Sequence, residues 1–246
     1  MKNSASWAPS KFIYKKGRLT ASKNKKEVNV GSRLNANLLA GFYDANIKKH
    51  VRGRLVDLGC GKVPLYAAYK DYITENICVD WGHSPHETSY LDYECDLSKP
   101  LPFKDGEFNT IILSDVLEHI PEPQLLWAEM GRILDKGGRL LMSAPFCYQL
   151  HEPPYDFYRY TEFALRRLAE SNGFKILLLE PLGGSVEVLT DFCAKHLQYL
   201  PVLGKPLALC IQSTTLWFGK TRLGKRIARR TSKFFPLGYF LVAEKQ

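Results

Sequence analysis

Short apolar runs alternate with longer stretches of helical periodicity along most of the chain. Runs of this kind lie at 54–58, 76–80, 108–113 and 139–144, each bounded by polar or turn residues. Such runs are typical of strands that are buried on both faces of a parallel sheet. The order of strand and helix patterns therefore predicts an α/β fold.

Apolar residues also recur at helical spacing. Leu34, Leu38, Phe42 and Ile47 fall near one side of a helix over 32–51. Further helices are expected at 63–69, at about 121–134, and from Thr161 to about 172–173, where Thr161 would be the N-cap. Additional strands are expected before Asp96, at 174–179 and at 235–243.

The stretch RLVDLGCG, residues 54–61, combines a predicted strand with a glycine turn. A turn of this kind presents backbone to a ligand at the carboxyl edge of an α/β sheet. A dinucleotide site would require a third glycine three residues after Gly61, where this chain has Pro64. The acid Asp57 before the glycines suits a positively charged ligand better than a pyrophosphate. The stretch thus favours a cationic nucleoside.

Several motifs then follow in order: D-L at 96–97, L-P-F-x-D-G-x-F-N, D-V-L-E-H-I, and W-x-E-M-x-R-I-L-x-x-G-G. Together with D-L-G-C-G they resemble the core of class I S-adenosylmethionine (SAM)-dependent methyltransferases of the small-molecule type. The resemblance covers about residues 54–180. It implies a Rossmann-like, seven-stranded, mostly parallel sheet with helices on both faces and an antiparallel terminal strand.

The resemblance also implies SAM as cofactor and S-adenosyl-L-homocysteine as product. Asp80, 19 residues after Gly61, would accept hydrogen bonds from the ribose hydroxyls. Asp96 would accept from the adenine amine, Leu97 would offer its backbone N–H, and Ser114 and Asp115 would lie beside the methionine end. The complete expected cofactor set is Asp57, Gly59, Cys60, Gly61, Asp80, Trp81, Asp96, Leu97, Ser114 and Asp115.

The loop SAPFCYQLHEPPYDFYRYT, residues 143–161, follows the 139–144 strand and is the expected acceptor wall. His151 is the leading candidate for a general base because its ordinary pKa is near neutrality, and Arg159 could hold an anionic group. A rigid surface loop is the alternative. The expected catalytic residues are His151, Glu152, Tyr158 and His119, and the expected substrate-binding residues are Tyr148, Asp156, Arg159 and Tyr160. His119 could instead be structural.

The two ends of the chain carry its positive charge. The net charge is +9, but residues 1–26 and 192–243 contain eight and nine Lys or Arg and no acid, so the remainder is acidic. We therefore expect a basic, loosely docked N-terminal arm at 1–30 and one methyltransferase domain at 31–246. The roughly 50 residues before the last strand predict a helical basic insertion at 185–233. Its 205–233 segment could bind an anionic membrane or cover the acceptor site.

Cysteine and hydropathy patterns add few constraints. The six cysteines show no zinc-ligand spacing, so no metal site is expected, and their apolar contexts favour reduced thiols in the cytoplasm. Neither a signal peptide nor a membrane-spanning run is predicted. The sequence therefore predicts a cytoplasmic protein, with membrane association left open.

The predicted function is SAM-dependent methyl transfer to a small-molecule or lipid- or glycan-linked acceptor, preferably at oxygen. One alternative is an RNA methyltransferase that uses the basic ends, although the acidic centre makes nucleic acid a less favoured partner. Another is a non-catalytic SAM-binding scaffold. The sequence leaves open the identity of the acceptor and the oligomeric state.

Overall fold

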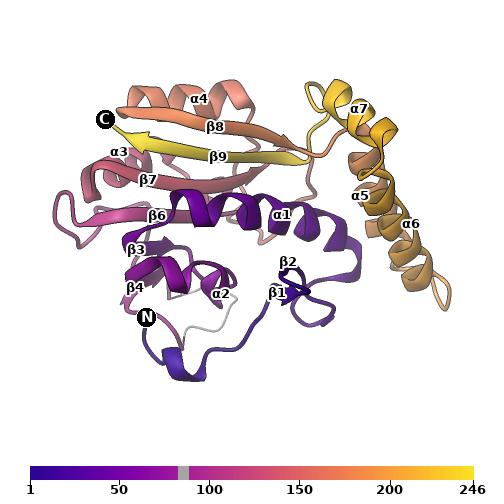
Figure 1. Cartoon of the computed structure of the whole chain (residues 1–246), viewed down its shortest axis with the longest axis horizontal. Coiled ribbons are helices and arrows are strands. Elements are labelled where there is room, and N and C mark those ends of the chain that lie inside the picture. The colour runs from indigo at the N-terminus through magenta and orange to yellow at the C-terminus, as the bar shows by residue number, and fades with distance from the viewer. Residues whose placement is uncertain (83–88) are drawn as a thin grey trace.

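A seven-stranded sheet forms the centre of the computed structural model, which describes residues 1–82 and 89–246 (Figure 1). The strand order is β5-β4-β3-β6-β7-β9-β8, and β9 runs antiparallel to both of its neighbours while the other pairs are parallel. The strands are β3 (Gly53–Leu58), β4 (Ile73–Asp80), β5 (Tyr93–Glu94), β6 (Phe108–Ser114), β7 (Leu134–Pro145), β8 (Phe174–Leu182) and β9 (Gly238–Lys245). The predicted Rossmann-like α/β fold is confirmed.

Helices cover both faces of this sheet (Figure 1). On one face lie α1 (Arg33–His50), α2 (Tyr66–Tyr69) and the short 3-10 helix Lys70–Tyr72, and on the other lie α3 (Pro123–Ile133) and α4 (Glu162–Ser171). Successive strand residues point to opposite faces. Leu55 accordingly packs in the core beneath α1, whereas Val56 packs in the core beneath α3.

The N-terminal residues are docked on the domain, which corrects the expected loose arm. After a 3-10 turn at Ser4–Ser6, β1 (Phe12–Lys15) and β2 (Arg18–Ala21) form a hairpin, in which Phe12 and Leu19 are buried. The Trp7 indole donates to backbone carbonyls of residues 62 and 63. In β2 the buried Leu19 and Ala21 alternate with the less buried Arg18 and Thr20, so a basic strand can still bury one of its faces.

Three helices occupy the expected insertion between β8 and β9. They are α5 (Ser185–Leu197), α6 (Gly204–Phe218) and α7 (Arg222–Thr231), at the right in Figure 1. The Gln212 amide ties α6 to the 3-10 helix Val30–Ser32 and the start of α1: it accepts from the Leu34 N–H at 2.7 Å and donates to the Val30 carbonyl at 2.8 Å. Among the described residues, no helix combines the length and apolarity needed to cross a membrane.

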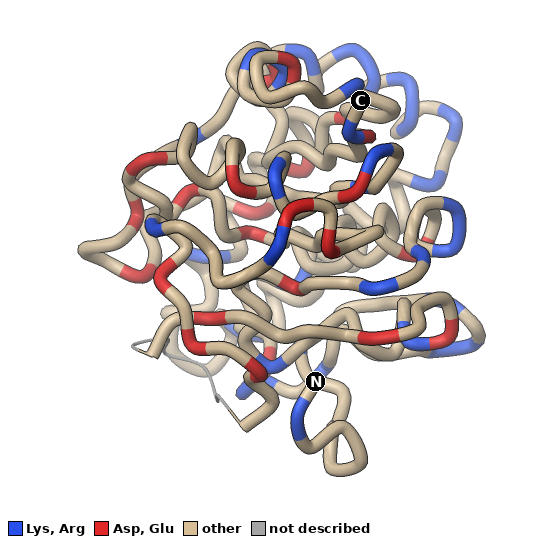
Figure 2. The backbone as a smooth tube through the Cα atoms, turned by 90° about the vertical axis from the view of Figure 1, so that its left-hand side faces the viewer, with Lys and Arg blue, Asp and Glu red and all other residues tan. Residues whose placement is uncertain are grey.

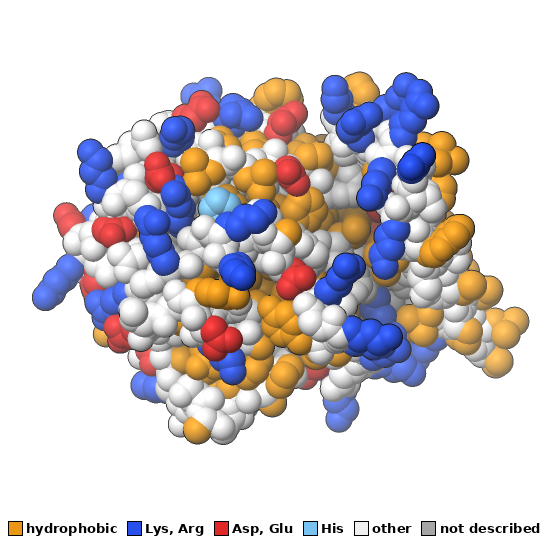
Figure 3. Space-filling view, in the orientation of Figure 1, with side chains coloured by type: hydrophobic (Ala, Val, Ile, Leu, Met, Phe, Trp, Pro, Cys, Tyr) orange, Lys and Arg blue, Asp and Glu red, His pale blue; other side chains and the backbone are white. Residues whose placement is uncertain are grey.

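Charge is distributed unevenly over the surface. The side nearest the amino ends of the parallel strands carries interspersed acidic and basic residues (Figure 2). By contrast, Lys and Arg gather over α7 (Figure 3), and the segment 205–233 contains eight of them and no acid. The insertion is thus the basic end of the molecule in space as well as in sequence.

Candidate active site

A cavity of about 980 Å³ lies at the carboxyl edge of the parallel strands. Its walls come from the turn after β3, the ends of β4, β6 and β7, the loop after β7, and the N-terminal segment. The lining includes nine of the ten expected cofactor residues, namely Gly59, Cys60, Gly61, Asp80, Trp81, Asp96, Leu97, Ser114 and Asp115. The strands thus bring together residues that are up to 56 positions apart.

The glycine turn has a defined shape that a larger residue would disturb. Gly59 has a φ of 68°, and a Cβ atom there would lie 2.4 Å from a methyl group of Val116. Asp80 fixes the same turn, because its Oδ2 accepts from the Gly61 N–H at 2.8 Å and its Oδ1 from the Trp81 N–H at 2.8 Å. The backbone of the turn is therefore held open toward the cavity.

Asp57 is the expected cofactor residue that is absent from the described lining of the cavity. Its buried carboxylate accepts from the Tyr69 hydroxyl at 3.0 Å, and Asn76 donates to that same hydroxyl oxygen at 3.0 Å. Burial raises the pKa of Asp57 to about 7. The expected role of Asp57 in cofactor binding stays a prediction; in this structure its side chain contacts Tyr69 in the core.

Asp96 and Leu97 lie where the β5 edge meets the cavity. Asp96 Oδ1 accepts from the Ser98 N–H at 2.9 Å, and this hydrogen bond is the main cause that lowers its pKa. Leu97 is buried and supplies an apolar surface. The pair thus offers an ionised carboxylate beside an apolar contact, which suits one edge and one face of a nucleobase.

Asp115, after β6, pairs with a residue that the sequence did not single out. Lys11 Nζ lies 3.0 Å from Asp115 Oδ2, and the Ser143 hydroxyl donates to Asp115 Oδ1 at 2.7 Å. Burial acts to raise the pKa of Asp115, but Lys11 and Ser143 outweigh it and leave that pKa lowered. No motif marked Lys11, because its position depends on the docking of the N-terminal hairpin.

Three side chains form a polar group on another part of the cavity wall. Glu118 and His119 belong to the 3-10 helix Leu117–His119, and His151 belongs to the loop after β7. Glu118 Oε1 lies 3.8 Å from His119 Nε2 and 3.6 Å from His151 Nε2. Burial lowers the pKa of His151, but Glu118 outweighs it and leaves that pKa raised. The sequence pointed to both histidines but not to Glu118 as their partner.

The remaining loop residues have divided roles. Tyr148 and Glu152 line the cavity, and the Tyr148 hydroxyl lies 3.2 Å from the Ser32 hydroxyl. Arg159 forms a two-pronged pair with Asp156, at 2.6 and 2.8 Å, and also donates to carbonyls of the same loop. Their expected substrate-binding role stays a prediction; in this structure the two residues pair with each other.

Two tyrosines likewise serve the loop. The Tyr158 hydroxyl donates to the Pro121 carbonyl at 2.9 Å, and the Tyr160 hydroxyl donates to the Leu117 carbonyl at 3.1 Å. Neither tyrosine is among the described residues that line the cavity, and their expected catalytic and substrate-binding roles stay predictions. They anchor the loop to the segment that carries Glu118 and His119.

Comparison with solved structures places this architecture in a known class. The [4+2]-cyclase SpnF aligns over 96% of this chain and 87% of its own, with a TM-score of 0.58 and 16% identity. A geranyl diphosphate methyltransferase in complex with SAM aligns over 91% of this chain and 93% of its own, with a TM-score of 0.56 and 13% identity. A SAM-dependent methyltransferase from Archaeoglobus fulgidus aligns over 87% of this chain and 97% of its own, with a TM-score of 0.54 and 15% identity. At these identities the likeness shows a shared fold.

Comparison of the sequence with protein-family models gives a second result. Residues 56–142 match the family model described as a methyltransferase domain. No curated protein matches the chain in sequence. The central part of the chain is thus similar to a methyltransferase domain, and the whole chain shares the fold of the solved SAM-dependent methyltransferases.

Proposed function

We propose that the protein transfers the methyl group of SAM to an oxygen atom of a small-molecule or lipid- or glycan-linked acceptor. The observation that carries this proposal is a single cavity whose wall holds both the expected cofactor residues and the group Glu118, His119 and His151. A cofactor and an acceptor that share one cavity can be held with the reacting atoms close and in line.

The described residues fit SAM. The Asp80 carboxylate accepts two backbone N–H groups at the cavity wall, and carboxylate oxygens are suitable acceptors for ribose hydroxyls. The space beside Gly59 would be lost to any side chain. Asp96 and Leu97 would bind the adenine. SAM itself supplies a methyl group that is already activated on a sulfonium, so the protein has mainly to position the acceptor.

The preference for oxygen comes from the chemistry of the acceptor wall. A hydroxyl must lose its proton when its oxygen is methylated, and carboxylate and imidazole groups are suited to assist that loss. Both ring nitrogens of His151 face carboxylates, with Nδ1 at 3.3 Å from Asp156 and Nε2 at 3.6 Å from Glu118. The three side chains would therefore act as one group, in place of His151 as a lone base.

Calorimetry with SAM and with S-adenosylhomocysteine tests the cofactor site. A second assay incubates the full chain with methyl-labelled SAM and separate panels of phenols, sugars, amines and extracted lipids, and measures S-adenosylhomocysteine formation. We expect turnover with hydroxyl compounds. Absence of binding to both SAM and its product would overturn the proposed function, and turnover confined to amines would overturn the choice of oxygen.

We further propose that the insertion docks on an anionic membrane that carries the acceptor. Large apolar side chains of the insertion and its flanks are exposed next to the basic residues, among them Phe192, Leu207, Trp217, Leu223 and Phe234. Figure 3 shows orange side chains beside the blue group over α6 and α7. A surface that combines exposed apolar and basic side chains suits binding to a lipid interface better than binding to RNA. An RNA-binding surface would require positive charge without so much apolar area.

Sedimentation with vesicles tests this docking. Binding should be stronger to vesicles with anionic lipid than to neutral ones, and Trp217→Ser and Arg226→Gln/Arg230→Gln should each weaken it. Arg166→Gln/Arg167→Gln in α4 removes the same charge elsewhere and should have little effect. Equal binding of all variants, or preferential binding to RNA, would contradict membrane docking.

A further inference from the structure

Glu118 has an unusual environment for a carboxylate. Its side chain is 0% exposed, and within the part of the chain that the structure describes neither carboxylate oxygen has a hydrogen-bond partner. An ionised carboxylate that is buried without hydrogen bonds is costly, by several kcal/mol in order of magnitude. A ligand that supplies positive charge would remove this cost.

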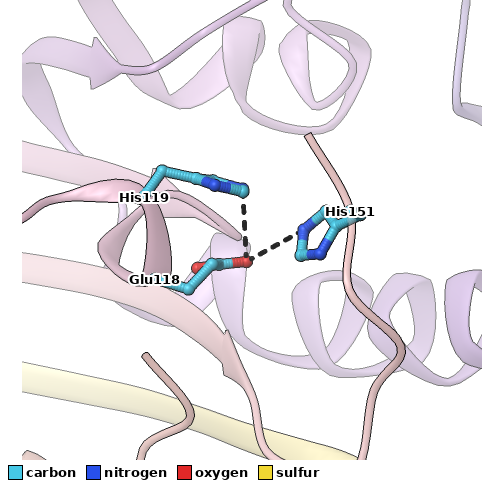
Figure 4. Close-up of side chains that lie close together, drawn as sticks. All are labelled: Glu118, His119 and His151. Carbon is cyan, nitrogen blue, oxygen red and sulfur yellow. Dashed lines mark ion pairs between the residues drawn. The ribbon is translucent and has the colours of Figure 1, made fainter. Parts of the chain in front are cut away.

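Two imidazole rings converge on the same carboxylate. Figure 4 shows His119 above Glu118 and His151 to its right, both facing one carboxylate oxygen. The Nε2–Oε1 distances are 3.8 and 3.6 Å. One ligand atom from each of the three residues can be chosen so that all lie within 4.8 Å of one another. The rings reach Glu118 from two segments, because His119 is its neighbour in the chain and His151 lies in the loop after β7.

The other ring nitrogens are oriented by groups behind them. His119 Nδ1 lies 2.6 Å from the Tyr155 carbonyl oxygen, which can only accept, so Nδ1 carries a proton and Nε2 is the ring nitrogen that faces Glu118. His151 Nδ1 lies 3.3 Å from Asp156 Oδ2, and Arg159 holds Asp156 in place. An imidazole with one nitrogen facing a carbonyl or carboxylate, and the other directed inward, is the usual arrangement of a metal ligand.

From these observations we propose that Glu118, His119 and His151 bind one divalent transition-metal ion. Metal–nitrogen and metal–oxygen bonds of about 2.1 Å place tetrahedral ligand atoms about 3.4 Å apart. The two Nε2–Oε1 separations of 3.6 and 3.8 Å are close to this value, and the widest separation within the group, up to 4.8 Å, would have to shorten when the ion binds. Two imidazoles and one carboxylate favour Zn²⁺ or Fe²⁺ over Mg²⁺, which prefers oxygen ligands.

The ion would have coordination positions left for the acceptor. Three protein ligands leave at least one position open, and all three residues line the cavity. A hydroxyl oxygen bound there would have a lowered pKa, and its proton could leave to water. This part rests on the proposed function, but binding of the ion does not.

The test uses the full chain, stripped with a chelator and titrated calorimetrically with Zn²⁺ and, separately, with Mg²⁺. We expect about one Zn²⁺ per chain and at least tenfold weaker binding of Mg²⁺. Glu118→Gln, which keeps the shape of the side chain, and His151→Ala should each weaken Zn²⁺ binding by at least tenfold. His196→Ala, on the exposed side of α5, is the matched control and should bind as the wild type does.

Replacing Zn²⁺ by Co²⁺ adds a readout of ligand type. The visible absorption of bound Co²⁺ differs between nitrogen and oxygen ligands and the thiolates of the free cysteines. Binding of S-adenosylhomocysteine reports whether each variant is folded. Zn²⁺ binding that is absent, or that is unchanged in Glu118→Gln and His151→Ala, would overturn the metal site, and the cluster would then share a proton instead. Loss of S-adenosylhomocysteine binding with intact Zn²⁺ binding would count against the proposed function only.

Discussion

The two sides of the cavity are built in different ways. On the donor side, Gly59, Gly61 and Asp80 follow two adjacent parallel strands, and backbone hydrogen bonds to Asp80 fix their geometry. The proposed acceptor side is assembled from a 3-10 helix, the long loop after β7, and the N-terminal segment that carries Lys11. Side-chain pairs such as that of Asp156 with Arg159 hold it together.

This difference means that the two sides should respond differently to substitution. The donor side is continuous with the buried sheet, so changes there should affect folding and cofactor binding together. The acceptor side has its own polar supports, so changes there should alter the loop, the acceptor or the ion while the cofactor still binds. Substitutions on each side of the cavity would test this separation.

Asp57→Asn should change how stability depends on pH. The folded-state pKa of Asp57 is about 7, above its ordinary value of 3.8, so the folded state binds the proton more tightly. Its contribution to stability is therefore largest at low pH and is lost as pH rises through about 7, by up to about 4 kcal/mol. Urea unfolding from pH 4.5 to 8 should show the variant gaining stability relative to wild type as pH rises.

The exposed acid Asp71 offers a matched control, since Asp71→Asn removes the same charge outside the core. The unfolding free energy of Asp71→Asn should depend on pH as that of the wild type does. Parallel curves for Asp57→Asn and wild type would contradict a neutral, protonated Asp57 in the folded state.

Gly59→Val should prevent tight cofactor binding. The new side chain would overlap Val116, and a φ of 68° costs a valine about 1–3 kcal/mol. We expect S-adenosylhomocysteine affinity to fall by more than about 100-fold (about 2.7 kcal/mol), measured by calorimetry. Gly41 lies at an exposed position of α1 with open space around it. Gly41→Ala should therefore raise the free energy of unfolding by about 0.5–1 kcal/mol.

Asp80→Ala and His151→Ala form a pair that separates the two sides directly. Loss of Asp80 removes charged hydrogen bonds to the turn and to a ribose, so S-adenosylhomocysteine affinity should fall about 10- to 100-fold, or about 1.5–3 kcal/mol. His151→Ala should leave that affinity near wild type and depress turnover. If His151→Ala abolishes cofactor binding, the division into donor and acceptor sides is wrong.

Arg159→Lys should have the smallest effect. Lysine keeps the charge but cannot make the two-pronged contact with Asp156 or the donations to loop carbonyls. We expect a loss of about 1 kcal/mol and faster proteolytic cleavage within 148–159. Arg166→Lys, whose pair with Glu170 is exposed, should change neither. Unaltered proteolysis of Arg159→Lys would remove the supporting role given to this pair.

Particular residues show why the sequence was a better guide to one side than to the other. Asp80 and Asp96 each follow a strand, so their place at the carboxyl edge follows from alternating elements and a parallel sheet. Arg159 is a polar residue like Asp80, yet its guanidinium donates two hydrogen bonds to Asp156 within the same loop. Residue type suggested a substrate contact, and only the coordinates reveal the nearer partner.

The sequence by itself determined the α/β alternation, the glycine turn, the acids that follow it and the helical insertion, because each depends on patterns within a few residues or on the order of elements. The tertiary structure decided the rest. It turned Asp57 into the core, seated the N-terminal hairpin so that Lys11 reaches Asp115, and brought His151 to Glu118. These contacts join residues 12 to 104 positions apart, and contacts of that kind are fixed by packing and by the need to satisfy buried charges, which no local pattern records.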